Sequence, residues 1–243
     1  MHSDFTGRVV VITGASGGIG RVLARRYAAR GANVALVARR PDELAVTAGV
    51  IAEEGGAASV HVVDIRDEHQ CHDVISAIMQ RWNRLDVLVN NAAVPGIDQR
   101  VHEATIANWQ SVFATNLFAP MVLTREALSQ AMIPTGSGNI QFVSSAAARL
   151  VQPKKAHYAA AKLGLTALAQ TLALELGSSG IRVNTVVVGS VAGELFDTYV
   201  ARRAAEVHQA ALGEHDDGVA LALGERPQVD LRLDVLADDA GVG

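Results

Sequence analysis

Short runs of apolar residues alternate along the chain with longer stretches in which apolar residues recur roughly every three to four positions. The first run, residues 9–12, consists of β-branched residues and ends at a glycine-rich turn, which is typical of a buried strand. The following stretch, residues 19–30, has helical spacing and stops at Gly31, a residue common just beyond a helix. A strand, a tight turn and a helix are therefore expected at the start of the fold.

The same alternation continues along the chain. Further strands are expected at residues 34–37, 60–63, 87–89, 140–143 and 183–187. Further helices are expected at residues 41–54, 68–81, 108–132 (with an interruption at Pro120) and 156–176. Connections of helix length between strands favour parallel pairing, and nearly continuous apolar strands indicate a sheet covered on both faces. The pattern predicts an α/β fold, a doubly wound parallel sheet with helices on both faces.

The chain is expected to form a single domain over residues 1–243, because it contains no internal repeat and no low-complexity linker. Residues 6–189 carry the regular alternation and form the expected core. Beyond this point the pattern loosens, and residues 190–243 are expected to supply a substrate loop and helices near 194–211 and 227–237.

Composition excludes several classes of function. The net charge of -4 offers no electrostatic basis for binding nucleic acid or an anionic membrane. A single cysteine, Cys71, excludes an internal disulfide and a multi-thiolate metal site. His69, Cys71 and His72 supply only two apparent ligands on one helix face, so no metal is expected. No apolar run reaches the roughly 20 residues that span a bilayer, and the N-terminus lacks signal-peptide order. These features predict a cytoplasmic protein with a small-molecule substrate.

The turn after the first strand contains Gly14, Gly18 and Gly20, in the order Gly-x-x-x-Gly-x-Gly. Glycines allow a tight turn and a close approach of the backbone to a pyrophosphate, and the N–H groups at the following helix N-terminus face the phosphates. A glycine-rich turn can also be a simple connector. Its place between a strand and a helix favours dinucleotide binding here.

The end of the second strand bears on the choice of nicotinamide cofactor. A carboxylate there binds the ribose 2′-hydroxyl, whereas a basic side chain accommodates a 2′-phosphate. The chain has Ala38 followed by Arg39 and Arg40, and the planar donors of Arg39 suit a phosphate. NADP(H) is therefore the preferred prediction and NAD(H) the alternative. The other interpretation, that Arg39 and Arg40 are solvated charges, stays open.

Tyr158 and Lys162 lie four residues apart in a predicted helix and so share one face. A free tyrosine has a pKa of about 10, but a neighbouring ammonium favours the phenolate, as would an oxidised nicotinamide. Such a tyrosine can act as general base in alcohol oxidation or as general acid in carbonyl reduction. The same spacing also arises by chance in ordinary helices. Ser145 strengthens the functional interpretation because it follows a strand, at the sheet edge where ligands bind.

Together with Asn90-Asn91-Ala92-Ala93 after the fourth strand, these motifs resemble the short-chain dehydrogenase/reductase family over about residues 6–189. The resemblance implies a Rossmann-type fold and hydride transfer between NADP(H) and a carbonyl or secondary alcohol. It implies that Tyr158 donates and accepts the proton, Lys162 binds the nicotinamide ribose, Ser145 holds the substrate oxygen and Asn116 holds a water. The spacing to Tyr158 favours Ser145 over its neighbour Ser144, and His157 is given no catalytic role.

The resemblance also implies which residues contact the cofactor. They are Gly14, Ser16, Gly18, Ile19, Gly20, Arg39, Asp64, Ile65, Asn90 and Ala92, with Tyr158 and Lys162 at the nicotinamide end. Taken alone, Asp64 is more typical of a helix cap, because the next helix opens nearby. The substrate pocket is expected in loops at residues 94–103, 146–155 and 190–213.

The chain departs from the family pattern at several positions. Ala93 replaces a glycine, Val188 replaces a proline and Gly193 replaces a threonine. The family's last edge strand is expected to be missing, which would leave the sixth strand exposed. These departures motivate an alternative, a cofactor-binding protein with little or no catalysis, such as a sensor or a non-catalytic subunit. A third hypothesis keeps the fold but uses the cofactor for epimerisation or dehydration.

By the same resemblance, subunits are expected to pair through the two long helices at residues 108–132 and 156–176. This predicts a homodimer, with a homotetramer as the alternative.

Overall fold

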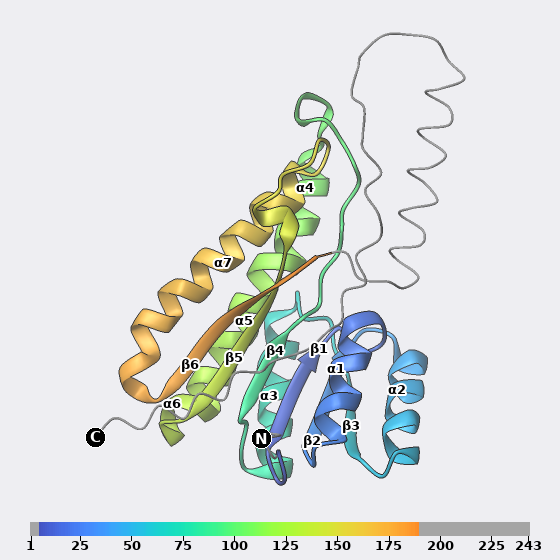
Figure 1. Cartoon of the computed structure of the whole chain (residues 1–243), viewed down its shortest axis with the longest axis vertical. Helices are drawn as coiled ribbons and strands as arrows, with labels where there is room; N and C mark the ends of the chain where they lie inside the picture. Colours follow the sequence, from blue (N-terminus) through green and yellow to red (C-terminus); the bar gives the residue numbers. More distant parts are fainter. Residues whose placement is uncertain (1–4, 190–243) are drawn as a thin grey trace. The chain divides into compact units, whose positions relative to one another are not determined.

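The computed structural model describes residues 5–189, which form a six-stranded parallel sheet (Figure 1). The strands are β1 (Val9–Thr13), β2 (Asn33–Ala38), β3 (Ala57–Val62), β4 (Val87–Asn90), β5 (Gly138–Ser145) and β6 (Ile181–Val188). Their order is β3-β2-β1-β4-β5-β6, so the direction of winding reverses between β1 and β4. This is the Rossmann-type α/β arrangement predicted from the sequence.

Helices connect the strands as expected. The longer ones are α1 (Gly18–Ala28), α2 (Pro41–Glu53), α3 (Glu68–Trp82), α4 (Ile106–Phe113), α5 (Ala119–Ala127) and α7 (Ala156–Leu176). Most bounds lie within a few residues of the expected ones. The strand expected at 60–63 instead begins at Ala57, because β3 is an outer strand whose partly exposed residues include two alanines and a serine. Such small residues do not form an apolar run that marks a strand.

The expected interruption at Pro120 is a widened turn and not a break. Helical structure continues from α4 through a π-helical segment, η2 (Ala114–Phe118), into α5, where Pro120 is the second residue. The Ala119 N–H bonds to the carbonyl of Ala114, five residues back. Proline has no N–H, so Pro120 cannot supply the usual bond to the carbonyl of Asn116. A second π-helical segment, η3 (Leu128–Met132), and the short α6 (Ile133–Thr135) follow α5.

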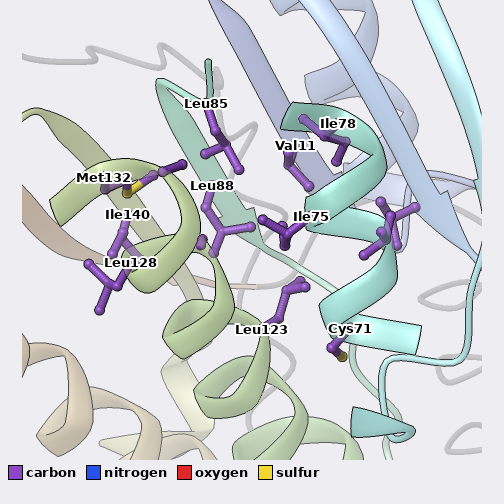
Figure 2. Close-up of a cluster of buried hydrophobic side chains, with 14 of the residues drawn as sticks. Val11, Cys71, Ile75, Ile78, Leu85, Leu88, Leu123, Leu128, Met132 and Ile140 are labelled. Carbon is purple, nitrogen blue, oxygen red and sulfur yellow. The ribbon is translucent and has the colours of Figure 1, made fainter. Parts of the chain in front are cut away.

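Hydrophobic side chains fill both faces of the sheet, as predicted. On one face, Ile75 of α3 and Leu123 of α5 pack against Leu88 of β4, all fully buried (Figure 2). Helix α7 adds Leu165 to the same cluster. On the other face, residues of α1 and α2 pack against alternate residues of β1 and β2. Successive strand residues point to opposite faces, so the continuous apolar run in β1 serves both clusters.

Within the described residues β6 pairs with β5 alone, and Val186 and Val187, near its C-terminal end, are exposed. The helices expected near 194–211 and 227–237, the substrate loop at 190–213, Gly193 and the expected loss of the last edge strand lie outside the described residues. Each helix in the described part of the chain is too short or too polar to cross a membrane.

Candidate active site

The glycine-rich turn joins β1 to α1 by a backbone route that only glycine permits at two points. Gly14 has a φ of +68°, in the left-handed region. A Cβ on Gly20 would lie 2.2 Å from the Gly14 carbonyl oxygen, so a side chain there is excluded. The first turn of α1 therefore packs directly on the turn that precedes it.

The N-terminus of α1 is suited to an anion. Gly17 precedes the helix, no side chain caps it, and its first turn contains no acidic residue. Helix N-terminal N–H groups that no side chain occupies attract phosphate. The cradle formed by Gly14, Gly18, Ile19 and Gly20 thus fits the pyrophosphate of a dinucleotide.

A buried threonine ties this turn to the chain that follows β4. The Thr13 hydroxyl accepts hydrogen bonds from the N–H groups of Asn91 and Ala92, both at 3.0 Å. The Asn91 side-chain amide donates in return to the Thr13 carbonyl at 2.9 Å. A Cβ on Gly14 would lie 3.0 Å from the Cα of Ala92. The ends of β1 and β4 thus meet where the strand order reverses, which is the usual ligand crevice of open α/β sheets.

Arg40, which the sequence suggested only as a solvated charge, reaches back to the glycine-rich turn. Its guanidinium donates to the hydroxyl of buried Ser16 at 3.1 Å and pairs with Glu43 at 3.0 Å. Arg39 is exposed at the end of β2. The sequence therefore drew attention to Arg39, whereas Arg40 makes the contact with the turn. The only signal for Arg40 in the sequence is its position next to Arg39.

Asp64 lies just beyond β3 and does not cap the next helix. The cap is Asp67, whose carboxylate accepts from the N–H groups of His69 and Gln70 at 2.9 and 3.2 Å. Asp64 instead binds the guanidinium of Arg66, which, with a smaller contribution from Arg39, keeps the pKa of the Asp64 carboxyl below its ordinary value. The cap interpretation of Asp64 is therefore wrong, because the helix starts later than that interpretation requires.

Two other residues expected at the adenosine side have roles in packing. Ile65 is buried in the cluster beneath α3, and Asn90 is buried at the end of β4. The Asn90 amide donates to the Thr124 hydroxyl of α5 at 3.0 Å, while its side-chain oxygen has no partner among the described residues. Asn90 therefore links the sheet edge to α5.

Tyr158, Ser145 and Lys162 converge where β5 ends. Ser145 is the last residue of β5, and its side chain is hydrogen-bonded to Tyr158 in the first turn of α7. Lys162, one turn further along α7, places its ammonium nitrogen 5.9 Å from the centre of the Tyr158 ring. The structure therefore brings together three of the four predicted catalytic residues, from a strand and the helix that follows it.

Ser144 and Ser145 point in different directions from the same strand. The Ser144 hydroxyl is buried and donates to the Lys162 carbonyl at 3.2 Å. It therefore attaches β5 to the backbone of α7, while Ser145 is bonded to Tyr158. Alternation of side chains along a strand explains the division, and it favours Ser145 as the predicted site residue.

Lys162 is 2% exposed and donates to the Val143 carbonyl at 2.7 Å. Burial lowers the pKa of Lys162 to about 8. Burial also raises the pKa of Tyr158, and the hydrogen bond from Ser145 opposes that rise. The lowering of the tyrosine pKa expected from its lysine neighbour is therefore absent, because burial of the phenol is the largest influence and the opposing one comes from Ser145.

Asn116, the fourth predicted catalytic residue, lies in η2 and is 1% exposed. Its side chain accepts from the Val94 N–H at 2.8 Å and donates to the Val94 carbonyl at 2.9 Å. Its main-chain carbonyl is the one that Pro120 cannot reach with an N–H. The side chain thus holds the loop after β4.

His72 and Cys71 of α3 are occupied by contacts within the protein. The Cys71 thiol is buried and donates to the Ile65 carbonyl at 3.1 Å, and a ring nitrogen of His72 lies 2.9 Å from Glu126. No group of three or more metal-ligating side chains occurs within residues 5–189.

Comparison with known proteins agrees with this architecture. The family model described as short chain dehydrogenase matches residues 8–204. Glucose 1-dehydrogenase 2 of Bacillus subtilis (strain 168) is 30% identical over 195 residues, which cover 80% of this chain and 76% of that protein.

Two solved structures are also similar to this chain. A metagenomic short-chain oxidoreductase in complex with NADP is 36% identical, with a TM-score of 0.74 and coverage of 84% of this chain and 91% of the other. An NAD+-bound xylitol dehydrogenase is 27% identical, with a TM-score of 0.78 and coverage of 88% and 80%. These relatives support a nicotinamide dinucleotide cofactor. The chain belongs to the short-chain dehydrogenase/reductase family of oxidoreductases.

Proposed function

We propose that the chain is an NADP(H)-dependent oxidoreductase that interconverts a carbonyl and a secondary alcohol, with Tyr158 as its general acid and base. The observation that carries this proposal is the convergence of Tyr158, Ser145 and Lys162 at the carboxyl end of β5. This end lies in the sheet next to β4, whose own end meets the glycine-rich turn.

Each of the three side chains has a distinct task. The Tyr158 hydroxyl gives its proton to the carbonyl oxygen in reduction and takes it back from the alcohol in oxidation. The Ser145 hydroxyl, already bonded to Tyr158, holds the same substrate oxygen as charge develops on it. Lys162 holds the nicotinamide ribose. The bound cofactor supplies the hydride and, when oxidised, a positive charge that opposes the rise of the tyrosine pKa caused by burial.

Asn116 belongs to the proposed proton path through its main-chain carbonyl. Its side chain is bound to Val94, and Pro120 leaves the carbonyl without the usual helical donor. A water held by this carbonyl would connect the interior of the site to bulk solvent.

The preference for NADP(H) rests on the cationic groups beside the glycine-rich turn. Ala38 offers no carboxylate at the end of β2, and Arg39 and Arg40 follow it. The bond from Arg40 to Ser16 places a guanidinium at the turn itself. A 2′-phosphate would find planar donors from these arginines and no opposing charge at Ala38. NAD(H) is the alternative. We place Asp64, Ile65, Asn90 and Ala92 on the adenosine side.

The proposed chemistry is tested with Tyr158→Phe, which removes the hydroxyl and keeps the ring. Turnover of a responsive substrate, found by following NADPH absorbance with a panel of ketones and alcohols, should fall on the order of 100-fold or more. NADPH affinity should stay within a few-fold. Tyr27→Phe is the matched control, because Tyr27 is a partly buried tyrosine of α1 that packs on Phe5. Undiminished turnover in Tyr158→Phe would rule out the mechanism, and cofactor binding without turnover of any substrate would favour a non-catalytic role.

Cofactor preference is tested by thermal shift with NADPH, NADP+, NADH and NAD+, because a bound ligand raises the apparent stability. NADPH should give a larger shift than NADH. Replacing Arg39 or Arg40 by alanine should weaken NADPH binding about tenfold, the effect of losing one charge-assisted hydrogen bond, and leave NADH binding unchanged. Arg26→Ala, an exposed arginine of α1, serves as control. Equal shifts for NADH and NADPH in the unmodified protein would refute the preference.

Lys162→Met should separate stability from activity. Because the pKa of Lys162 is lowered to about 8, the unfolded chain binds its proton more tightly, and the buried ammonium destabilises the folded state at neutral pH. Removing it should raise the free energy of unfolding at pH 7 by roughly 1–2 kcal/mol, after the lost bond to Val143 is subtracted. The gain should shrink as the pH rises from about 8, where Lys162 of the folded protein loses its proton, towards 10.5, where the unfolded chain loses it too. Turnover of the Lys162→Met protein should be lost.

Denaturant unfolding at pH 7 and pH 9.5 measures this difference. Lys154→Met replaces an exposed lysine and should change stability by less than about 0.5 kcal/mol at both pH values. A Lys162→Met protein that is less stable than the wild type at pH 7 would show that the buried ammonium contributes net stability.

We further propose a homodimer formed through α5 and α7, with a homotetramer as the alternative. An apolar groove between α7 and the continuous helical segment α5–η3–α6 is lined mainly by Met121, Leu128, Ile133, Leu168 and Leu172. Light scattering should report a dimer or tetramer, and Met121→Glu should shift it towards monomer by placing a charge in the groove. Val22→Glu changes a comparably exposed apolar residue on α1 and should leave the assembly intact. A monomeric wild-type protein would exclude the proposal.

A further inference from the structure

We propose that His157 and Asn108 are positioning residues that hold the loop 94–97 at a fixed place between the start of α7 and the turn that carries Asn116. The loop would then form a rigid wall of the substrate pocket beside Tyr158. This inference rests on the proposed function, because it assigns the loop a role in substrate binding by the same site.

The loop contains no helix or strand, yet buried side chains bind its main chain at three of its four residues. Asn116 binds both main-chain groups of Val94. His157 binds the Pro95 carbonyl at 3.1 Å. Asn108 accepts from the Ile97 N–H at 2.9 Å and donates to the Ile97 carbonyl at 2.8 Å. The three side chains are between 1% and 6% exposed, so water does not compete readily for these bonds.

Both the His157 ring and the Pro95-Gly96 segment determine the geometry of their contact. A carbonyl oxygen only accepts, so the His157 ring nitrogen that faces Pro95 must carry the hydrogen. A Cβ on Gly96 would lie 2.6 Å from that nitrogen, and Gly96 has a φ of +69°. The ring also meets Trp109 of α4 edge-on, at 6.3 Å between centroids. Pro95-Gly96 thus gives the loop a shape that fits against this histidine.

Further bonds attach the loop's continuation to the residues just before α7. The Gln99 N–H donates to the Lys154 carbonyl at 3.2 Å, and Asp98 forms an ion pair with Lys155. The loop therefore touches the segment that carries Tyr158 and the segment that carries Asn116. A shift of the loop would disturb both, whereas the Ile97 side chain remains 65% exposed and able to meet a ligand.

His157 is adjacent to Tyr158 in sequence but touches none of the proposed reacting atoms. Consecutive helical residues point about 100° apart, so its side chain faces α4 and the loop. Its effect on turnover would thus pass through the loop. A purely structural role predicts loss of stability alone, whereas a positioning role also predicts a change in substrate KM that a replacement donor restores.

The test compares His157→Leu, which removes the donor, with His157→Gln, whose amide nitrogen can donate from a similar position. His157→Leu should raise the substrate KM and lower kcat/KM about tenfold or more, the effect of leaving a buried carbonyl unpaired. NADPH affinity should stay within about twofold. His157→Gln should restore most of kcat/KM. His61→Leu, which removes a histidine bonded to Ser59 on the outer strand β3, should leave all these quantities unchanged.

Hydrogen exchange of the Val94 and Ile97 amides gives a readout that does not need turnover. Exchange at both should accelerate in His157→Leu and in Asn108→Leu, and return towards the wild-type rate in His157→Gln. Faster exchange without any turnover of the wild type would contradict the proposed function and retain the positioning of the loop. Unchanged exchange, unchanged KM in a folded His157→Leu protein, or failure of glutamine to restore kcat/KM would overturn the inference.

Discussion

Helix α7 is held against β5 by bonds that run in both directions between three consecutive strand residues and one helix turn. The Val143 carbonyl receives the Lys162 ammonium, the Ser144 hydroxyl donates to the Lys162 carbonyl, and the Ser145 side chain bonds to Tyr158. Burying an ammonium ion costs several kcal/mol before any compensating bond is counted. The hydrogen bond to the Val143 carbonyl offsets part of this cost, and the contact brings a phenol, a hydroxyl and an amine together. Such local instability is common at sites whose geometry is required for function.

The glycine-rich turn between β1 and α1 depends on a different constraint, which is the close approach of one backbone segment to another. Gly20 packs on the Gly14 carbonyl, and Thr13 binds the two residues after β4 through a single hydroxyl. In the sheet, a single strand, β4, separates β1, which precedes the glycine-rich turn, from β5, which ends at Ser145. A dinucleotide lying across the ends of β1 and β4 would therefore bring its nicotinamide end towards the end of β5, where Ser145, Tyr158 and Lys162 lie.

The fold, and the presence of Tyr158 and Lys162 on one helix face, could be predicted because they depend on local patterns. Apolar runs marked the inner strands, and spacing within one helix placed Tyr158 and Lys162 on the same face. Long-range contacts could not be predicted in this way. Nothing near Arg40 in the sequence indicates Ser16, and nothing near Ser144 indicates the backbone of α7. The direction in which the pKa of Tyr158 shifts could not be predicted either. It depends on how deeply the phenol is buried, which only the packed structure reveals.

Pro120 illustrates how one residue can have a local effect that is predictable and a distant one that is not. Its missing N–H predicted an irregularity in the helix, and the chain accommodates it with the π-helical turn η2. That turn directs the Asn116 side chain at Val94, so the irregularity becomes an anchor for the loop after β4. The same loop is anchored by Asn108 from α4 and by His157 from α7. A helix defect, two buried amides and a histidine thus act on three residues of the loop, Val94, Pro95 and Ile97, so that a segment without regular structure has its main-chain groups satisfied by buried side chains.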